Sequence, residues 1–408
     1  MAELIAGIST IRRIVRCMVP AAGWLLALAV NSPAAAQQAD YLYVWAAAAD
    51  TARGSVLAVF DIGRGAQDRL VRLVPAGTPS GGAHHIEHAL SGERTLFANA
   101  FGAGRTFLFD LSKPAEPRLA ASLDDAGPFS HPHSYVRLPG GNVLATFQWK
   151  TGGALPGGLV ELDKSGKALR WASAATTEAD SLQIVPYSLA VLPALDRIVS
   201  TSTHMIEDIG VHVQIWRLSD LKLLRTIAVP RAAAHQDHSA HDSTHHRLPG
   251  EPRVLADGKT VMFGTFTCGL YRVTGLDTED PQVVFTQAFP GADCAVPVVI
   301  GNYWIQTVPA LRALVALDVT DPAHPVEASR ILFGEPTRPH WLAADAAGRR
   351  LVTTSASPGD ANLYIVDFDR VNGRLSRRTH VPVVTMRGLL WPDGYRGNAV
   401  PHGVVFGQ

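Results

Sequence analysis

The histidines are the residues of this 408-residue chain whose spacing suggests chemistry, since there are 16 of them and several recur in one context. A proline followed directly by a histidine opens three similar segments, and a related segment opens with two consecutive histidines. The residues concerned are His84, His85, His133, His340 and His402. Neutral imidazole is the commonest metal ligand in proteins, and several imidazoles together suit copper, zinc or iron. We therefore predict one shared transition-metal site, with backbone hydrogen bonding by these histidines as the alternative.

Further polar residues accompany these histidines. Glu87 and His88 follow the doubled histidine, and both are candidates for proton transfer beside a metal. The segment 235–246 holds five histidines in twelve residues, a composition typical either of metal-binding tracts or of a solvated insertion. His131 and His204 are candidates for the surroundings of the metal. The ordinary surface or strand histidines are expected to be His212, His324 and His380.

A repeat predicts the elements that must position the histidines. A stretch of alternating β-branched, aromatic or other apolar residues, usually ending in Asp, occurs seven times. The copies cover residues 54–62, 104–111, 157–164, 212–220, 268–277, 312–321 and 361–369. Alternation with a period of two that ends at Asp, Gly or Pro is typical of a strand and its turn.

A second phrase accompanies each copy: it opens with proline, passes through one strand, turns at Gly or Asp and enters another strand. It begins near residues 132, 186, 249 and 339, has a variant at 83, is weakest near 297 and is truncated at 401. Two hairpins in about 53 residues, seven times, predict an all-β, seven-bladed β-propeller as a single domain over residues 37–408. The strand at 41–45 would pair with the C-terminal segment and close the ring. Two smaller β domains in tandem are the competing architecture.

The propeller also predicts where the histidines meet. The first strand of each blade lines the central channel, so the residues that follow the recurrent proline occupy equivalent places around it. Four blades carry histidine there. Closure of the ring makes these four blades contiguous, and we expect their imidazoles at one mouth of the channel.

Composition limits the classes of partner. The 36 basic and 36 acidic residues balance, which argues against a nucleic-acid partner, and 47% apolar with 18% charged residues argues against disorder. Residues 1–36 contain arginines, then an apolar run, then Ala34-Ala35-Ala36, the order of a cleaved signal peptide. We expect a periplasmic or secreted protein with a small-molecule substrate and no membrane association after cleavage. Its oligomeric state stays open.

The export route and the state of the cysteines also stay open. Arg12-Arg13 is compatible with twin-arginine export, although the following residues fit that signal poorly. Cys268 and Cys294 are the two cysteines that follow the predicted cleavage site. In an exported protein they form either one disulfide or two buried free thiols.

An ordered series of motifs resembles the selenium-binding protein family, which includes the copper-dependent methanethiol oxidases. The series runs from about Ala83 to the C-terminus. It comprises the doubled histidine, GRTFLFDLSKPAEPRL, the Pro132-His133 strand with LPGGNV, HVQIWRLSDLKLLRTI, ALDVTDPAHPV, GRRLVTTS with VDFDRVNGRL, and AVPHGVVF. The resemblance implies a seven-bladed propeller with a copper centre of channel histidines, onto which His84, His85, His133 and His402 map.

The implied activity is oxidation of a small thiol such as methanethiol by O2. Three departures bear on this expectation, and the first two are that Ile86-Glu87-His88 stands where the family has a cysteine pair and that Val136 replaces a frequent second histidine. His340 stands where the family more often has another residue. The alternatives are a non-catalytic periplasmic metal-binding propeller and a protein-interaction propeller, because one fold hosts many functions.

Overall fold

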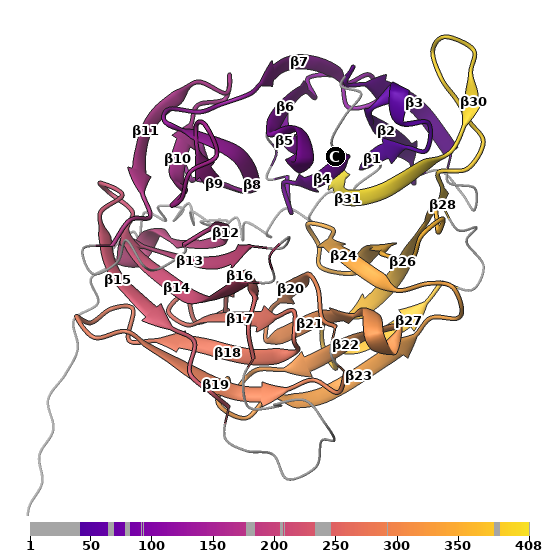
Figure 1. The fold of residues 1–408 in the computed structure, drawn as a ribbon. Helices are drawn as coiled ribbons and strands as arrows, with labels where there is room; N and C mark the ends of the chain where they lie inside the picture. Colours follow the sequence, from indigo (N-terminus) through magenta and orange to yellow (C-terminus); the bar gives the residue numbers. More distant parts are fainter. Residues whose placement is uncertain are drawn as a thin grey trace, which may run out of the picture. The chain divides into compact units, whose positions relative to one another are not determined.

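Six four-stranded antiparallel sheets and one five-stranded sheet make up most of the structure, a computed structural model that describes residues 41–63, 69–77, 82–90, 92, 94–176, 184–204, 207, 209–232, 246–291, 293–378 and 384–407. The sheets are arranged as the blades of a β-propeller around a central axis (Figure 1), and the region along this axis is called the channel below. The predicted fold class is therefore confirmed. The predicted signal peptide, most of the 235–246 segment and His380 lie outside the described residues.

Each blade is named here by its innermost strand, and its strands are given from the channel outward. The first four blades are β31 (Ala399–Gly407), β1 (Tyr41–Ala48), β2 (Ser55–Asp61), β3 (Arg69–Pro75); β4 (Ala83–Ile86), β5 (Thr95–Ala100), β6 (Arg105–Asp110), β7 (Arg118–Leu123); β8 (Phe129–Arg137), β9 (Val143–Lys150), β10 (Gly158–Leu162), β11 (Ala168–Ser173); and β12 (Pro186–Leu192), β13 (Arg197–His204), β14 (Ile209–Arg217), β15 (Leu223–Ala228). The other three are β16 (Pro249–Val254), β17 (Val261–Thr265), β18 (Gly269–Thr274), β19 (Gln282–Ala288); β20 (Pro297–Ile300), β21 (Tyr303–Val308), β22 (Ala313–Asp318), β23 (Val326–Leu332); and β24 (Pro339–Ala344), β25 (Arg350–Ser355), β26 (Asn362–Asp369), β27 (Arg374–Arg377).

Short elements join or extend the blades. Strand β28 (Val384–Thr385) pairs with β26, and β29 (Leu389–Leu390) pairs with β30 (Arg396–Gly397). Four 3-10 turns are described: η1 (Thr51–Arg53), η2 (Phe101–Ala103), η3 (Pro193–Leu195) and η4 (Pro309–Leu311). In the part of the chain that is described, no helix has the length and apolar character needed to cross a membrane.

The seven repeated stretches are the third strands of the seven blades. Most of their residues are buried, as in β2, where only Asp61 is not. Outer strands such as β7 and β11 alternate between exposed and partly buried residues, because one face packs on a neighbouring blade and the other meets water. The apolar clusters lie between successive blades, so each blade depends on its neighbours for its core.

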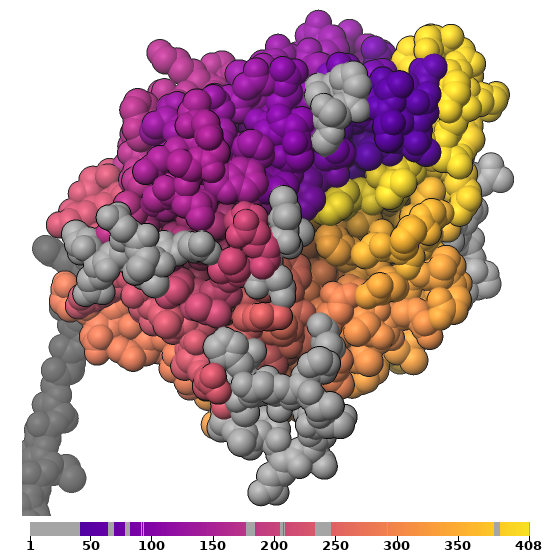
Figure 2. Space-filling view, in the orientation of Figure 1, coloured from indigo at the N-terminus to yellow at the C-terminus, as the bar shows by residue number. Residues whose placement is uncertain are grey.

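The two ends of the described chain close the ring, as predicted. Strand β1 pairs on one side with β2 and on the other with the C-terminal strand β31, so that Tyr43 lies opposite both Val59 and Val405. Figure 2 shows the consequence at the surface, where C-terminal residues in yellow lie beside N-terminal residues in indigo. Closure pairs the edges that an open array of blades would expose.

A β-bulge at the start of the innermost strand recurs in six blades. In β8, for example, Pro132 pairs with Phe147 and Tyr135 with Ala145, so β8 advances three residues while β9 advances two. The same extra residue occurs in β4, β12, β16, β24 and β31, whereas β20 pairs regularly. A bulge breaks the alternation of a strand, so two successive residues become available to the channel. We call them the first and second channel positions.

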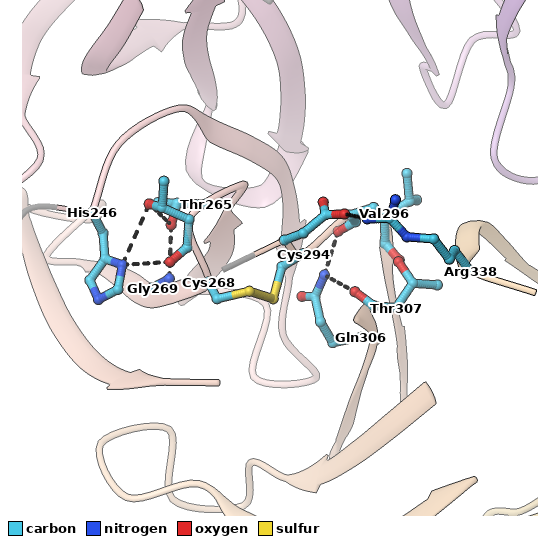
Figure 3. The surroundings of a disulfide bond; sticks show 12 residues. His246, Thr265, Cys268, Gly269, Cys294, Val296, Gln306, Thr307 and Arg338 are labelled. Atoms are coloured by element: carbon cyan, nitrogen blue, oxygen red, sulfur yellow. Dashed lines mark hydrogen bonds and ion pairs between the residues drawn. A yellow bond between two sulfur atoms is a disulfide. The ribbon is translucent and has the colours of Figure 1, made fainter. Parts of the chain in front are cut away.

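A disulfide joins two neighbouring blades (Figure 3). Cys268 lies in the turn before β18 and Cys294 in the segment before β20, and their Cα atoms are 5.1 Å apart. The amide of Cys294 donates to the Phe266 carbonyl at 3.1 Å, which further fixes the segment. Of the two states left open by the sequence, the structure contains the disulfide.

Candidate metal centre

The structure brings the predicted ligand histidines together from four contiguous blades. His84, His133, His340 and His402 occupy the first channel positions of the β4, β8, β24 and β31 blades, and His85 occupies a second position. The His84 ring centroid lies 4.3 Å from that of His85, 4.9 Å from that of His133 and 4.4 Å from that of His402. All are far closer than the separation of about 10 Å at which ligands of one ion with bonds near 2.1 Å could not meet.

Three of these imidazoles form the tightest group. His84, His85 and His133 each offer one nitrogen, and these nitrogens lie within 4.8 Å of one another. Two nitrogens bound to one ion at about 2.1 Å are at most about 4.2 Å apart, so small ring rotations are enough for all three to share an ion.

Hydrogen bonds determine which nitrogen faces the centre. His133 Nδ1 donates to the Tyr187 carbonyl at 2.8 Å, and His85 Nδ1 lies 3.2 Å from Ser134 Oγ and 3.5 Å from Glu251 Oε1. These contacts place the proton on Nδ1 of both rings and leave the Nε2 lone pairs free. Metal-binding histidines characteristically donate their other ring N–H in this way.

Buried nitrogens without a partner are the clearest sign that the residues fit a metal. Within the described residues, His84 Nδ1, His85 Nε2, His133 Nε2 and His402 Nδ1 are buried and make no hydrogen bond. Buried polar atoms almost always have a partner, and each exception needs a reason. Four such atoms on adjacent imidazoles have a common reason if they coordinate one ion.

His340 lies at the edge of the group. Its ring centroid is 4.8 Å from that of His402, and its side chain is only partly buried. Its backbone is fixed by a hydrogen bond from Thr307 Oγ1 to the His340 carbonyl at 2.9 Å. Because its side chain is partly exposed and its closest imidazole is that of His402, His340 is an outer member of the cluster.

The surroundings favour neutral imidazoles, the form that binds metal. Burial lowers the pKa of His133 to about 4, although Glu251 and the Tyr187 carbonyl partly offset it. Burial, followed by the neighbouring imidazoles, holds the pKa of His84 and His85 well below the usual range, and His402 behaves alike. Each lone pair is thus available without loss of a proton near neutral pH.

Side chains of the second strands hold the bulges in place. Asn99 on β5 accepts from the His85 amide at 2.8 Å and donates to the His133 carbonyl of the next blade at 2.7 Å. Thr146 on β9 links the Ser134 amide to the Tyr187 carbonyl in the same manner, and Thr354 donates to the His402 carbonyl. The histidine backbones are therefore fixed both within a blade and to its neighbour.

The two predicted proton-transfer residues lie in different surroundings. The carboxylate of Glu87, which is 1% exposed, pairs with Arg137 through contacts of 2.9 and 2.7 Å and accepts from the Phe97 amide. Arg137 and Phe97 belong to β8 and β5, so the Glu87 carboxylate links two neighbouring blades. His88 stacks on Trp341 with centroids 4.3 Å apart, and its Nε2 lies 3.3 Å from Glu251.

Glu251 is the residue at the centre that the sequence analysis did not assign. It occupies the second channel position of the β16 blade, is 3% exposed and contacts both His85 and His88. Burial opposes its ionisation, but the contacts with His88, Arg253 and Ser188 outweigh this and hold its pKa well below the usual range. Its place two residues after the recurrent Pro249 was the available signal.

An aromatic group borders the histidines on another side. The Phe101 ring lies 5.6 Å from the rings of His84, His133 and Trp149. His131, in a left-handed conformation with φ of 58°, packs edge-on to Trp149. The ring centroid of His204 lies 5.7 Å from that of Trp149. His131 and His204, which we expected near the metal, therefore pack against the aromatic residues Phe101 and Trp149.

The remaining histidines lie elsewhere. His324 is exposed and pairs with Asp321, and His212 is on β14. Of the histidine-rich segment only His246 is described, and its Nδ1 contacts the Thr267 carbonyl near the disulfide (Figure 3).

Comparison with solved structures supports the fold. A hypothetical selenium-binding protein from Sulfolobus tokodaii matches with a TM-score of 0.72 and 14% identity over 90% of this chain and 94% of that one. The periplasmic gluconolactonase of Pseudomonas aeruginosa matches with a TM-score of 0.60 and 13% identity over 90% and 99%. A putative 6-phosphogluconolactonase from Bacteroides uniformis matches with a TM-score of 0.60 and 12% identity over 86% and 98%.

These identities show a shared propeller and leave the activity open. No family model matches the chain, and no curated protein matches it. Because propellers with different names share the architecture, function has to be argued from the histidine cluster.

Proposed function

We propose that this chain is an exported copper-dependent oxidoreductase of the selenium-binding protein and methanethiol oxidase type, which oxidises a small thiol with O2. The observation that carries the proposal is the convergence of four buried imidazole nitrogens without hydrogen-bond partners among the described residues. Imidazole suits copper, and the disulfide and the predicted signal peptide support an oxidising compartment such as the periplasm. The motif series supports this family over the lactonases that share the fold.

His84, His85 and His133 would hold the ion, with His402 as a further ligand and His340 at the mouth. Copper would supply thiolate binding and electron transfer to O2, which side chains alone do not provide. With methanethiol, one O2 and one water would yield formaldehyde, hydrogen sulfide and hydrogen peroxide. Phe101 would offer the alkyl group an apolar wall next to His84 and His133.

The role of the protein in this proposal is to orient the imidazoles and to move protons. The Tyr187 carbonyl holds the His133 proton on Nδ1. His88 keeps its assignment to proton transfer, because its side chain is 16% exposed and its Nε2 lies close to the buried Glu251. We assign Glu87 to the blade scaffold instead, through its ion pair with Arg137.

Metal analysis combined with turnover tests the proposal. Protein purified without a histidine tag should hold about one copper per chain, consume O2 with methanethiol and release sulfide and peroxide. His84→Ala together with His402→Ala should remove both the copper and the activity. Copper without turnover would favour the non-catalytic metal-binding propeller, and protein that takes up no metal would contradict the proposed centre.

A further inference from the structure

Five polar side chains surround the buried carboxylate of Glu251. Its Oε1 accepts from Ser134 Oγ at 3.3 Å and lies 3.5 Å from His85 Nδ1. Its Oε2 accepts from Ser188 Oγ and from Arg253 Nη1 at 3.1 Å, and lies 3.3 Å from His88 Nε2. A carboxylate with 3% exposure and donors on both oxygens is held rigidly.

Three of the five partners of Glu251 come from equivalent places in successive blades. His85, Ser134, Ser188 and Glu251 are the second channel positions of the β4, β8, β12 and β16 blades. The bulges turn these four side chains towards one another across the channel. They form a polar layer next to the first channel positions, which carry His84, His133 and His402.

This layer acts directly on one predicted ligand. An ionised carboxylate only accepts hydrogen bonds, so Ser134 donates its one hydroxyl proton to Glu251. The Ser134 oxygen can then only accept from His85 Nδ1, 3.2 Å away, which requires the proton of His85 on Nδ1. The lone pair of His85 is then on Nε2, the buried atom without a partner among the described residues. The Tyr187 carbonyl has the corresponding effect on His133.

We propose that Glu251 is a positioning residue of the metal centre, which fixes the tautomer and the orientation of His85 through its carboxylate. The inference rests on the proposed function for the identity of the ion, but it makes a separate claim about the metal-free protein. Arg253 balances the charge of Glu251, and Ser134 and Ser188 hold its oxygens in place. Glu251 acts through His85 and is not itself assigned a contact with the substrate.

Glu87 provides a matched control within the same chain. Both glutamates are buried, both pair with an arginine, and both lie on the innermost part of a blade. The Glu87 carboxylate pairs with Arg137 and accepts from the Phe97 amide, whereas Glu251 contacts the imidazoles of His85 and His88. Glu87→Gln therefore removes a buried charge without removing the contact to His85.

The first experiment uses the metal-free full chain with ¹⁵N-labelled histidine. Long-range ¹H–¹⁵N spectra should show His85, identified by its loss in His85→Gln, as the Nδ1–H tautomer in the wild type and in Glu87→Gln. The amide of Glu251→Gln can donate as well as accept, so this variant should lose that preference. An unchanged Nδ1–H tautomer in Glu251→Gln would overturn the inference, even if the protein binds no copper.

The second experiment measures copper affinity by competition with a chelator. Loss of an outer residue that orients a ligand histidine typically weakens metal binding 10- to 100-fold, and we expect a loss in this range for Glu251→Gln. Glu87→Gln should stay within about twofold of the wild type, which would bind tightly. If Glu251→Gln fails to fold, Ser188→Ala replaces it, because it removes one donor to Glu251 and should weaken binding by about threefold.

The two claims fail in different ways. A wild type that binds no copper but keeps the Nδ1–H tautomer of His85 contradicts the proposed function and leaves the positioning claim supported. A wild type that binds copper tightly, with Glu251→Gln equal to it in affinity, overturns the role of Glu251 alone.

Discussion

Replacement of Asn99 with alanine should loosen the candidate centre without touching an imidazole. Asn99 is fully buried on β5, accepts from the His85 amide and donates to the carbonyls of Pro132 and His133 at 2.8 and 2.7 Å. It thus fixes the backbones of two predicted ligands in two blades. The Asn99 side chain therefore joins the innermost strands β4 and β8 at the two residues that carry predicted ligands.

The magnitude follows from the groups that Asn99→Ala leaves unpaired. A buried donor or acceptor without a partner costs about 1–3 kcal/mol, and at least the His85 amide and the His133 carbonyl lose their contact. We therefore expect a loss of about 3 kcal/mol in the free energy of unfolding. Because both ligand backbones are released, copper affinity should also fall by at least about tenfold.

Asn142→Ala is the control for this variant. Asn142 Nδ2 donates to Glu161 at 2.7 Å in a partly buried contact away from the histidines. Its replacement should cost about 1 kcal/mol or less and leave copper affinity unchanged. Urea unfolding of the metal-free proteins, followed by circular dichroism and tryptophan fluorescence, and a chelator competition supply the two readouts. Equal effects of the two replacements on both readouts would refute the positioning role of Asn99.

Four other results are expected. Because the pKa of His133 is lowered to about 4 in the folded protein against about 6.5 unfolded, the unfolded chain binds more protons between these values. Metal-free protein should therefore be most stable above pH 6.5 and lose roughly 3 kcal/mol from this group as the pH falls towards 4; urea titrations with no loss in that window would contradict this. Replacing Cys268 and Cys294 with serine should cost about 3 kcal/mol, as expected for a closed loop of this size, and leave the copper content intact; loss of copper would show that the bridge supports the centre. Deleting residues 235–246 should leave the channel copper in place and at most slow its loading; copper-free protein from this deletion would instead indicate a metal carrier. His340→Ala should weaken copper binding less than His84→Ala, and the reverse order would contradict the outer position of His340.

The blades and the convergence of the histidines could be predicted because both depend on the period of the repeat. Seven third strands with Asp at their ends gave the blade count, and the Pro-His pairs fell at equivalent places on the innermost strands. The β20 blade, whose repeat was weakest, is the one in which the innermost strand pairs regularly. Period alone was sufficient for these features.

The period of the repeat marks the place of Glu251 after Pro249, but it does not indicate that Glu251 contacts His85 and His88 or that Glu87 pairs with Arg137. The second channel positions hold His85, Ser134, Ser188 and Glu251, which are of three different residue types, so the repeat does not mark them as a set. They meet because the bulges break the strand alternation, and a bulge has no clear signature in these segments. Glu87 follows the histidines in the sequence, yet its carboxylate pairs with Arg137 and accepts from the Phe97 amide, contacts that the sequence does not indicate.

Copper-edge anomalous diffraction from crystals of the full-chain protein, grown without a histidine tag, tests the central claim most directly. We predict one strong peak in the channel, about 2.0–2.1 Å from His84 Nδ1, His85 Nε2 and His133 Nε2, with His402 as the next neighbour. A copper-loaded crystal with no peak among these nitrogens, or with its peak at the 235–246 segment, would contradict it.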